Sequence, residues 1–280
     1  MKRIFTLCIA LCTIITGFAQ TDTTAKQAPD TIKIGGMVII REKGSQPDKE
    51  DNSKRRRLTI SSRRNNDKPS NISTNWWILD LGFSNWVDNT NYASAGAQAF
   101  APGSNEDWFK LRTGKSRNVN LWFFMQRLNI AKHIVNLKYG VGLELNNYHF
   151  DDTRVQFSKK PTLIALNPDL ENARKNKLAA DYLTVPMMLN FNFTPKRSKG
   201  FGLSAGVSAG MLYSARQKTK NDGDVDKTKS DFNLERFKLS YVGELLLGPV
   251  KLYGSYAFKN MWEKGLDMTP YTVGFRISNW

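Results

Sequence analysis

The sequence has almost no cysteine. Its two cysteines, Cys8 and Cys12, both lie within the first 19 residues, so the rest of the chain excludes disulfide bonds and thiolate metal sites. Beyond residue 20 no apolar run approaches the ~18 residues that a membrane-spanning helix needs, which excludes a helical membrane protein. Acidic residues are also scarce, because 25 Asp and Glu stand against 41 Lys and Arg and give a formal net charge of +16.

The first 19 residues predict a secretory signal peptide. Lys2 and Arg3 form a basic start, residues 4–15 are mostly apolar, and Gly-Phe-Ala at 17–19 provides small residues for cleavage. Neither cysteine follows the small residue that a lipoprotein signal requires, so no lipid anchor is expected. An exported chain without disulfides has to be stabilised by its sheet, and closure of a sheet into a barrel can achieve this.

Residues 20–75 predict a basic and mainly disordered periplasmic segment. Within it, residues 31–41 alternate and can form a strand that is broken by a turn at Gly35 and Gly36. Its basic block consists of Lys54, Arg55, Arg56, Arg57, Arg63 and Arg64. An exported chain does not meet nucleic acid, so this block is either a solvated tether or a contact for anionic lipid headgroups or an acidic partner.

The clearest pattern in the sequence lies at residues 201–213. Every odd position is apolar, whereas the even positions up to Gly210 are glycine or serine. This period of two predicts a strand with bulky side chains on one face only. Such a strand suits a closed barrel whose outer face meets lipid and whose inner face is crowded.

From residue 76 onward the sequence predicts eight strands. They are residues 76–87, 118–130, 135–148, 178–193, 201–213, 237–247, 250–258 and 271–279. In the second strand Met125 is expected to face outward, while Trp122 and Phe124 are expected to fill the core. Pro186 in the fourth strand predicts a bulge or a local gap, because proline cannot donate to a ladder.

The connections between these strands alternate in length. Those after the second, fourth and sixth strands are short, whereas residues 88–117, 149–177 and 216–236 form long ones. This alternation is typical of outer-membrane barrels, with turns in the periplasm and long loops outside. The sequence therefore predicts an all-β fold, an eight-stranded antiparallel up-and-down transmembrane β-barrel at residues 76–280.

Several stretches resemble the PorT-like outer-membrane β-barrel proteins of Bacteroidetes. They are Asp-Thr-Ile-Lys-Ile-Gly-Gly-Met-Val-Ile-Ile at 30–40, Leu-Asp-Leu-Gly-Phe-Ser-Asn-Trp-Val at 79–87, Leu-Lys-Tyr-Gly-Val-Gly-Leu-Glu at 137–144 and Tyr-Leu-Thr-Val-Pro-Met-Met-Leu at 182–189. The resemblance implies eight strands, insertion into the outer membrane of a Gram-negative cell and, for most members, no assigned chemistry. Trp280 departs from the usual terminal aromatic, because it has the inward parity of Arg276 and Ser278.

Charged residues at inward positions predict a polar lumen. They are Lys138, Glu144, Lys238, Glu244, Lys251 and Arg276. An eight-stranded barrel is only just wide enough for its side chains, so these acids and bases are expected to pair and pack rather than to line an open pore.

No catalytic, cofactor-binding or metal-binding residue is predicted. Residues 222–226 begin like a calcium loop, but Lys227 replaces its glycine and Asn233 its closing glutamate. His149, Asp151 and Asp152 lie together in the sequence, but no second pair of catalytic residues accompanies them. We therefore expect a non-enzymatic structural or interaction protein of the cell envelope, in contact with outer-membrane lipid and the barrel-assembly machinery. A protein-export component, a narrow channel and a barrel enzyme are the alternatives.

Overall fold

The computed structural model describes residues 31–34, 37–40, 70–195 and 200–278. The predicted signal peptide, the basic block and Trp280 lie outside these ranges. The chain divides into two units, Met1–Asp67 and Lys68–Trp280. In the first unit the strand is broken between residues 34 and 37, as predicted, and its two halves, β1 (Thr31–Ile34) and β2 (Met37–Ile40), pair antiparallel with each other.

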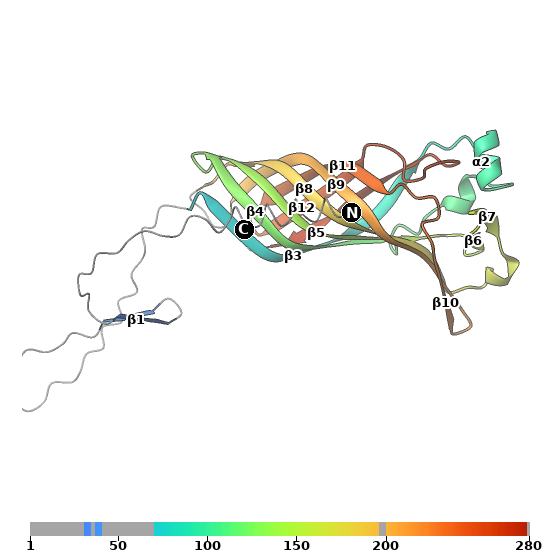
Figure 1. Ribbon diagram of the computed structural model, residues 1–280, viewed down its shortest axis with the longest axis horizontal. Helices are drawn as coiled ribbons and strands as arrows, with labels where there is room; N and C mark the ends of the chain where they lie inside the picture. Colours follow the sequence, from blue (N-terminus) through green and yellow to red (C-terminus); the bar gives the residue numbers. More distant parts are fainter. Residues whose placement is uncertain (1–30, 35–36, 41–69, 196–199, 279–280) are drawn as a thin grey trace, which may run out of the picture. The chain divides into compact units, whose positions relative to one another are not determined.

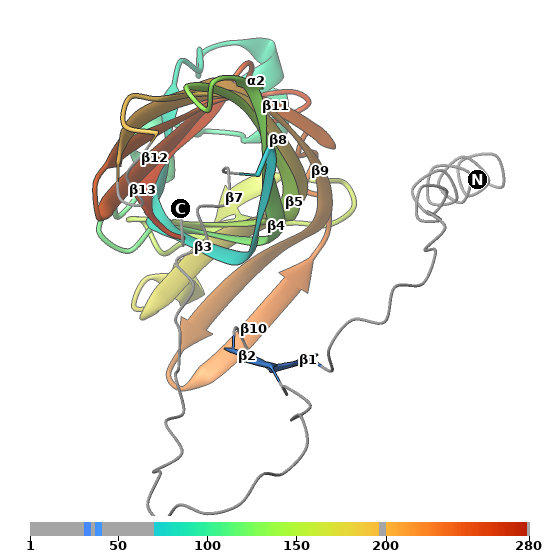
Figure 2. The same cartoon turned by 90° about the vertical axis from the view of Figure 1, so that its left-hand side faces the viewer.

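The second unit is a closed ring of eight antiparallel strands (Figure 2). In order around the ring they are β3 (Ile72–Asp88), β4 (Arg117–Ala131), β5 (Val135–His149), β8 (Lys175–Asn192), β9 (Phe201–Asn221), β11 (Phe237–Leu247), β12 (Val250–Ala257) and β13 (Met268–Ile277). Each strand pairs with the next, and β13 pairs with β3 to close the ring. The predicted up-and-down order of eight strands is confirmed.

The two ends of the ring differ (Figure 1). One end, the short-turn end, carries the brief connections between β4 and β5, β8 and β9, and β11 and β12. The other, the long-loop end, carries α2 (Ala95–Phe100), η1 (Glu106–Phe109), β6 (Val155–Phe157), β7 (Ile164–Leu166), η2 (Pro168–Leu170) and β10 (Asp224–Lys229). No helix among the described residues is long and apolar enough to cross a membrane.

Apolar side chains cover the outside of the ring. On β8 the outward residues Val185 and Met187 are 47% and 54% exposed, while the inward residues Thr184 and Met188 are buried. The same alternation on other strands produces a continuous lipid-facing band. Its members include Leu81, Phe83, Leu183, Val185, Met187, Leu189, Phe191, Leu203, Val207, Met211, Tyr213, Leu239, Tyr241, Leu245, Val273, Phe275 and Ile277. Apolar surface of this extent fits lipid and not water.

A bulge in β4 reverses the predicted orientation of two residues. Trp122 pairs with Gly142 and Phe124 with Val141, so Phe123 is an extra residue that shifts the phase of the strand. Trp122 points inward as expected. Met125, however, is fully buried, and the ring of Phe124 lies 5.8 Å from that of the exposed Trp76. The predictions for Met125 and Phe124 were therefore wrong.

Pro186 interrupts the ladder between β5 and β8. Pairing stops between Tyr139 opposite Met187 and Gly142 opposite Thr184, whereas the ladder to β9 runs through Pro186 without a break. Proline has no N–H to donate to a neighbouring strand. The pairing is therefore lost on the side of β5 only and is kept on the side of β9. The predicted local gap is confirmed.

The region predicted as a loop at residues 216–236 is largely strand. β9 continues to Asn221 and turns back through β10, which pairs with it from Asp224 opposite Asn221 to Lys229 opposite Arg216. The extension has polar residues on both faces, so no apolar alternation marked it in the sequence. The prediction of a long loop was wrong at this place.

Candidate functional site in the barrel lumen

Two opposite walls of the barrel exchange charges across the lumen. β5 carries Lys138 and Glu144, and β11 carries Lys238 and Glu244, with the same spacing in both strands. Because β5 and β11 run in opposite directions, each lysine meets the glutamate of the other strand. Lys138 Nζ donates to Glu244, and Lys238 Nζ donates to Glu144. These side chains are at most 10% exposed, so the barrel wall largely shields both pairs from water.

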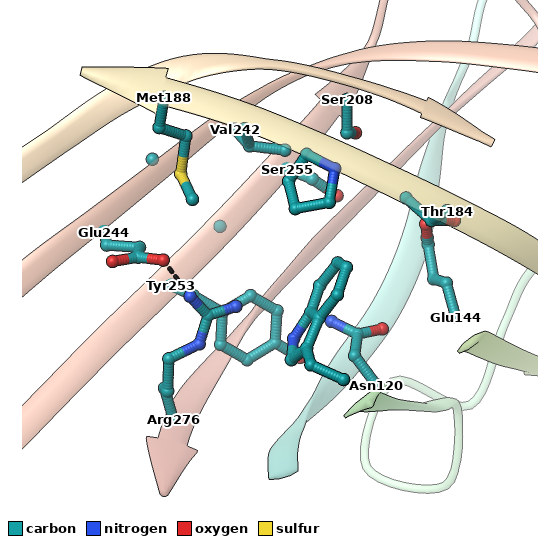
Figure 3. Close-up of a pocket in the computed structure, with 14 residues that line it drawn as sticks. Asn120, Glu144, Thr184, Met188, Ser208, Val242, Glu244, Tyr253, Ser255 and Arg276 are labelled. Carbon is teal, nitrogen blue, oxygen red and sulfur yellow. Dashed lines mark hydrogen bonds and ion pairs between the residues drawn. The ribbon is translucent and has the colours of Figure 1, made fainter. Parts of the chain in front are cut away.

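Arg276 on β13 joins this exchange to Asp80 on β3. Its Nε and Nη2 each donate to Asp80 at 2.6 Å, and its Nη1 donates to Glu244 (Figure 3). Asp80 is fully buried and lies directly opposite Arg276 in the sheet register. The bidentate geometry is the strongest arrangement of a guanidinium and a carboxylate.

Polar and aromatic side chains complete the surroundings of Asp80 and Arg276. Trp122 Nε1 donates to Asp80 at 2.7 Å, and Asn120 Nδ2 donates at 3.2 Å. The guanidinium carbon of Arg276 lies 5.5 Å from the ring centre of Trp122 and 6.0 Å from that of Tyr253. Asp80 therefore accepts hydrogen bonds from three side chains. The guanidinium of Arg276 makes cation–π contacts with two aromatic rings.

The sixth predicted residue, Lys251, lies near the short-turn end. Its Nζ donates to the backbone carbonyl and to the hydroxyl of Ser278, at 2.6 and 2.8 Å. The structure thus links Lys138, Glu244 and Arg276 into one cluster, and places Lys238 with Glu144 beside it.

Little open space remains between these side chains. The cavity beside Arg276, Glu244 and Tyr253 has a volume of about 30 Å³. This volume has room for one or two water molecules. The lumen at this level is filled rather than hollow.

The long loops close the barrel at the long-loop end with an aromatic cap. Phe157 of β6 stacks on Trp262 at 5.8 Å with an angle of 6° between the rings, and Phe232 lies 5.4 Å from Phe157. The cap is continuous with inward residues of the strands. Its members include Trp86, Phe100, Phe109, Tyr148, Phe150, Phe157, Tyr182, Phe232, Leu234 and Trp262. These aromatic residues thus form an internal core at this end of the barrel.

His149 and its two neighbouring aspartates do not form a dyad. Asp151 accepts from Arg112 at 3.0 Å, and Asp152 accepts from Arg154 at 2.8 Å. His149 ends β5 beyond the lipid-facing band, where burial and then the charge of Lys177 lower its pKa to about 4. Among the described residues no group of three His, Cys, Asp or Glu side chains could hold a metal ion.

The sequence did not single out Asp80, although Asp80 is central to the cluster. Its inward parity was visible from the apolar residues Leu79 and Leu81 on either side. Its partners were not, because Arg276 is 196 positions away and becomes adjacent only when the ring closes. An inward carboxylate flanked by outward leucines was the one available indication.

The family model described as the outer membrane protein beta-barrel domain matches residues 79–261 of this chain. No curated protein matches the chain. Two crystal structures of Ail, the attachment invasion locus protein of Yersinia pestis, are similar to this chain. One has 11% identity and a TM-score of 0.31, covering 73% of this chain and 98% of that one. The other, in complex with the heparin analogue sucrose octasulfate, has 12% identity, a TM-score of 0.30 and the same coverage, 73% and 98%.

Similarity to the Ail structures at this level carries no statement about function. The family match, by contrast, extends from β3 to beyond β12 and so covers most of the ring. This chain belongs to the outer membrane protein beta-barrel domain family, and its barrel lies in the outer membrane in contact with membrane lipid.

Proposed function

We propose that this barrel acts without catalysis, as a structural or interaction protein of the cell envelope. The observation that supports this proposal is the filled lumen. Charged pairs cross the barrel from β5 to β11, and the aromatic cap lies above them. A channel needs a continuous aqueous path, and an enzyme of the outer loops needs a nucleophile or a base with an orienting partner. The paired charges across the lumen favour a structural or interaction role over a channel, and the ion pairs of Asp151 with Arg112 and of Asp152 with Arg154 favour it over an enzyme of the outer loops.

Conductance measurements test this proposal against the channel alternative. The full mature chain, inserted into planar bilayers, is expected to give no steady unitary current above that of the same detergent preparation without protein. The physical reason is that ions cannot pass a cluster of paired side chains with a cavity of about 30 Å³. A reproducible, ion-selective current would contradict the proposed structural or interaction role and favour a narrow channel.

A finer proposal is that the protein is a component of a protein-export machine, as its resemblance to PorT-like barrels implies. Support comes from the alternation of loop lengths, because an even number of strands leaves both chain ends on the side of the short turns. The segment that precedes β3 would then extend into the periplasm, where its basic residues would contact anionic headgroups or an acidic partner.

Deletion and complementation test the export role. Cells without this chain are expected to retain normally secreted proteins in the periplasm, and the full chain is expected to restore their export. A chain without residues 31–67, which keeps the whole of β3, is expected to insert into the outer membrane but not to restore export, because it lacks the proposed contact. Normal secretion in the deletion strain would contradict the export role while leaving the structural role intact.

A further inference from the structure

Three neighbouring strands at the long-loop end carry a dense group of lysines on their outer face. This lysine face consists of Lys175 and Lys177 on β8, Lys218 and Lys220 on β9, and Lys227 and Lys229 on β10. Lys177 lies opposite Lys218, and Lys218 lies opposite Lys227, so three lysines form one row across the sheet. Lys175 lies opposite Lys220 in the next row. Cβ atoms of opposite residues are about 4.5–5.5 Å apart.

The lysine face continues the lipid-facing band. On β8 the positions of outward parity run from the exposed Leu183 through Asp181 and Ala179, which are buried, to the partly exposed Lys177, while the inward Leu178 is buried in the core. The change from apolar to basic residues occurs where Tyr213 is half exposed and where Arg216 forms an ion pair with Asp181. Aromatic residues and then cations at the end of a membrane span mark the level of the lipid headgroups.

The hairpin of β9 and β10 projects away from the ring (Figures 1 and 2). Hydrogen bonds on its inner face hold this position, since Gln217 Oε1 accepts from Phe157 N at 3.0 Å and Gln217 Nε2 donates to Val155 O at 2.7 Å. Because the strands lean away from the barrel axis, their outer face turns toward the membrane plane. The face of the hairpin that carries the lysines is therefore the face on the side of the leaflet.

The lysines of this face repel one another with little compensation. Lys177 donates to Asn147, and none of the other five lysines has a carboxylate partner among the described residues. The acidic residue of β10 between Val225 and Lys227 is Asp226, which lies on the other face. Burial and the neighbouring charges of Lys175 and Arg216 lower the pKa of Lys177 to about 8. Like charges placed directly opposite destabilise a sheet, so an anion bound between the rows would relieve this repulsion.

We propose that the lysine face binds the phosphate groups of phosphorylated lipids in the outer leaflet of the outer membrane. The position of the lysines, directly beyond the apolar band and turned toward the leaflet, selects a membrane-bound phosphate over a soluble polyanion. Each row supplies two or three ammonium groups, which match the multiple charges of a phosphorylated headgroup. The inference depends on the barrel and its orientation, and not on a role in protein export.

The test uses the full mature chain in zwitterionic detergent. The chain is titrated with lipid A that carries its phosphates and, separately, with lipid A from which they have been removed, and bound lipid is counted by native mass spectrometry. The natural chain is expected to bind the phosphorylated form at least about 10-fold more tightly, with an affinity that falls as salt is added. The triple variant Lys177→Gln, Lys218→Gln and Lys227→Gln is expected to lose on the order of 100-fold in affinity.

A matched variant controls for the loss of three charges. Lys159, Lys160 and Lys264 are exposed lysines of the long loops outside the lysine face, and their replacement by glutamine is expected to change the affinity less than about threefold. In detergent without lipid A, the first triple variant is expected to remain folded and to unfold at an equal or higher urea concentration than the natural chain, because repulsion has been removed.

Two results would overturn the proposal. One is equal binding of both lipid forms by the natural chain, or unchanged binding by the first triple variant. The other is loss of binding of a soluble sulfated polysaccharide in that variant while lipid A binds as before, which would assign the face to a soluble polyanion.

Discussion

Replacement of Arg276 by methionine is expected to lower the free energy of unfolding by about 3–5 kcal/mol. Arg276 is the cation that Asp80 contacts through two hydrogen bonds, and Asp80 is fully buried. Without the guanidinium, a carboxylate stays in the lumen with only the neutral donors of Trp122 and Asn120. Urea unfolding in detergent, followed by tryptophan fluorescence, measures the loss.

A second substitution separates the charge effect from lost packing. Adding Asp80→Asn to Arg276→Met removes the orphaned charge, so the double variant is expected to lose less stability than the single one. The exposed pair of Arg112 and Asp151 provides a control, because Arg112→Met is expected to cost less than about 1 kcal/mol. A single Arg276→Met variant as stable as the Arg112→Met control would show that the lumen cluster does not stabilise the barrel.

Replacement of Val207 by arginine is expected to destabilise the barrel in lipid by about 2–4 kcal/mol. Val207 is 41% exposed in the middle of the outward series of β9, between Tyr241 on β11 and Met187 on β8. A guanidinium at this height would have to leave water for hydrocarbon. Urea unfolding of the chain folded into phosphatidylcholine vesicles measures the difference.

Val225 offers a matched control for Val207. It is 47% exposed on β10, on the same outer face but beyond the lipid-facing band. Val225→Arg leaves the side chain out of the hydrocarbon but places a cation opposite Lys220, and is therefore expected to cost at most about 1 kcal/mol. Equal effects of the two substitutions would contradict the placement of the membrane along β9.

The arrangement of the strands was largely predictable from local patterns. Alternation of apolar and small residues, as at 201–213, identified each strand and its outward face, and the alternation of loop lengths identified the topology. The errors occurred where the phase changes without a chemical sign. Phe123 forms a bulge, although no proline or glycine in β4 indicates one. β9 extends beyond Tyr213 with polar residues on both faces, so no apolar alternation marks the extension.

The sequence by itself determined the class of this protein, because a strand that faces lipid must alternate and the alternation is local. Only the tertiary structure decided which inward charges meet. Lys138 and Glu244 are 106 positions apart in the sequence, and Arg276 and Asp80 are 196 positions apart. The two residues of each pair become neighbours only when the ring closes. The same holds for the lysine face, whose members come from three strands and form a row only through their register. The face of the sheet on which a residue lies can be read from its own strand, but the residue that it lies opposite depends on the partner strand.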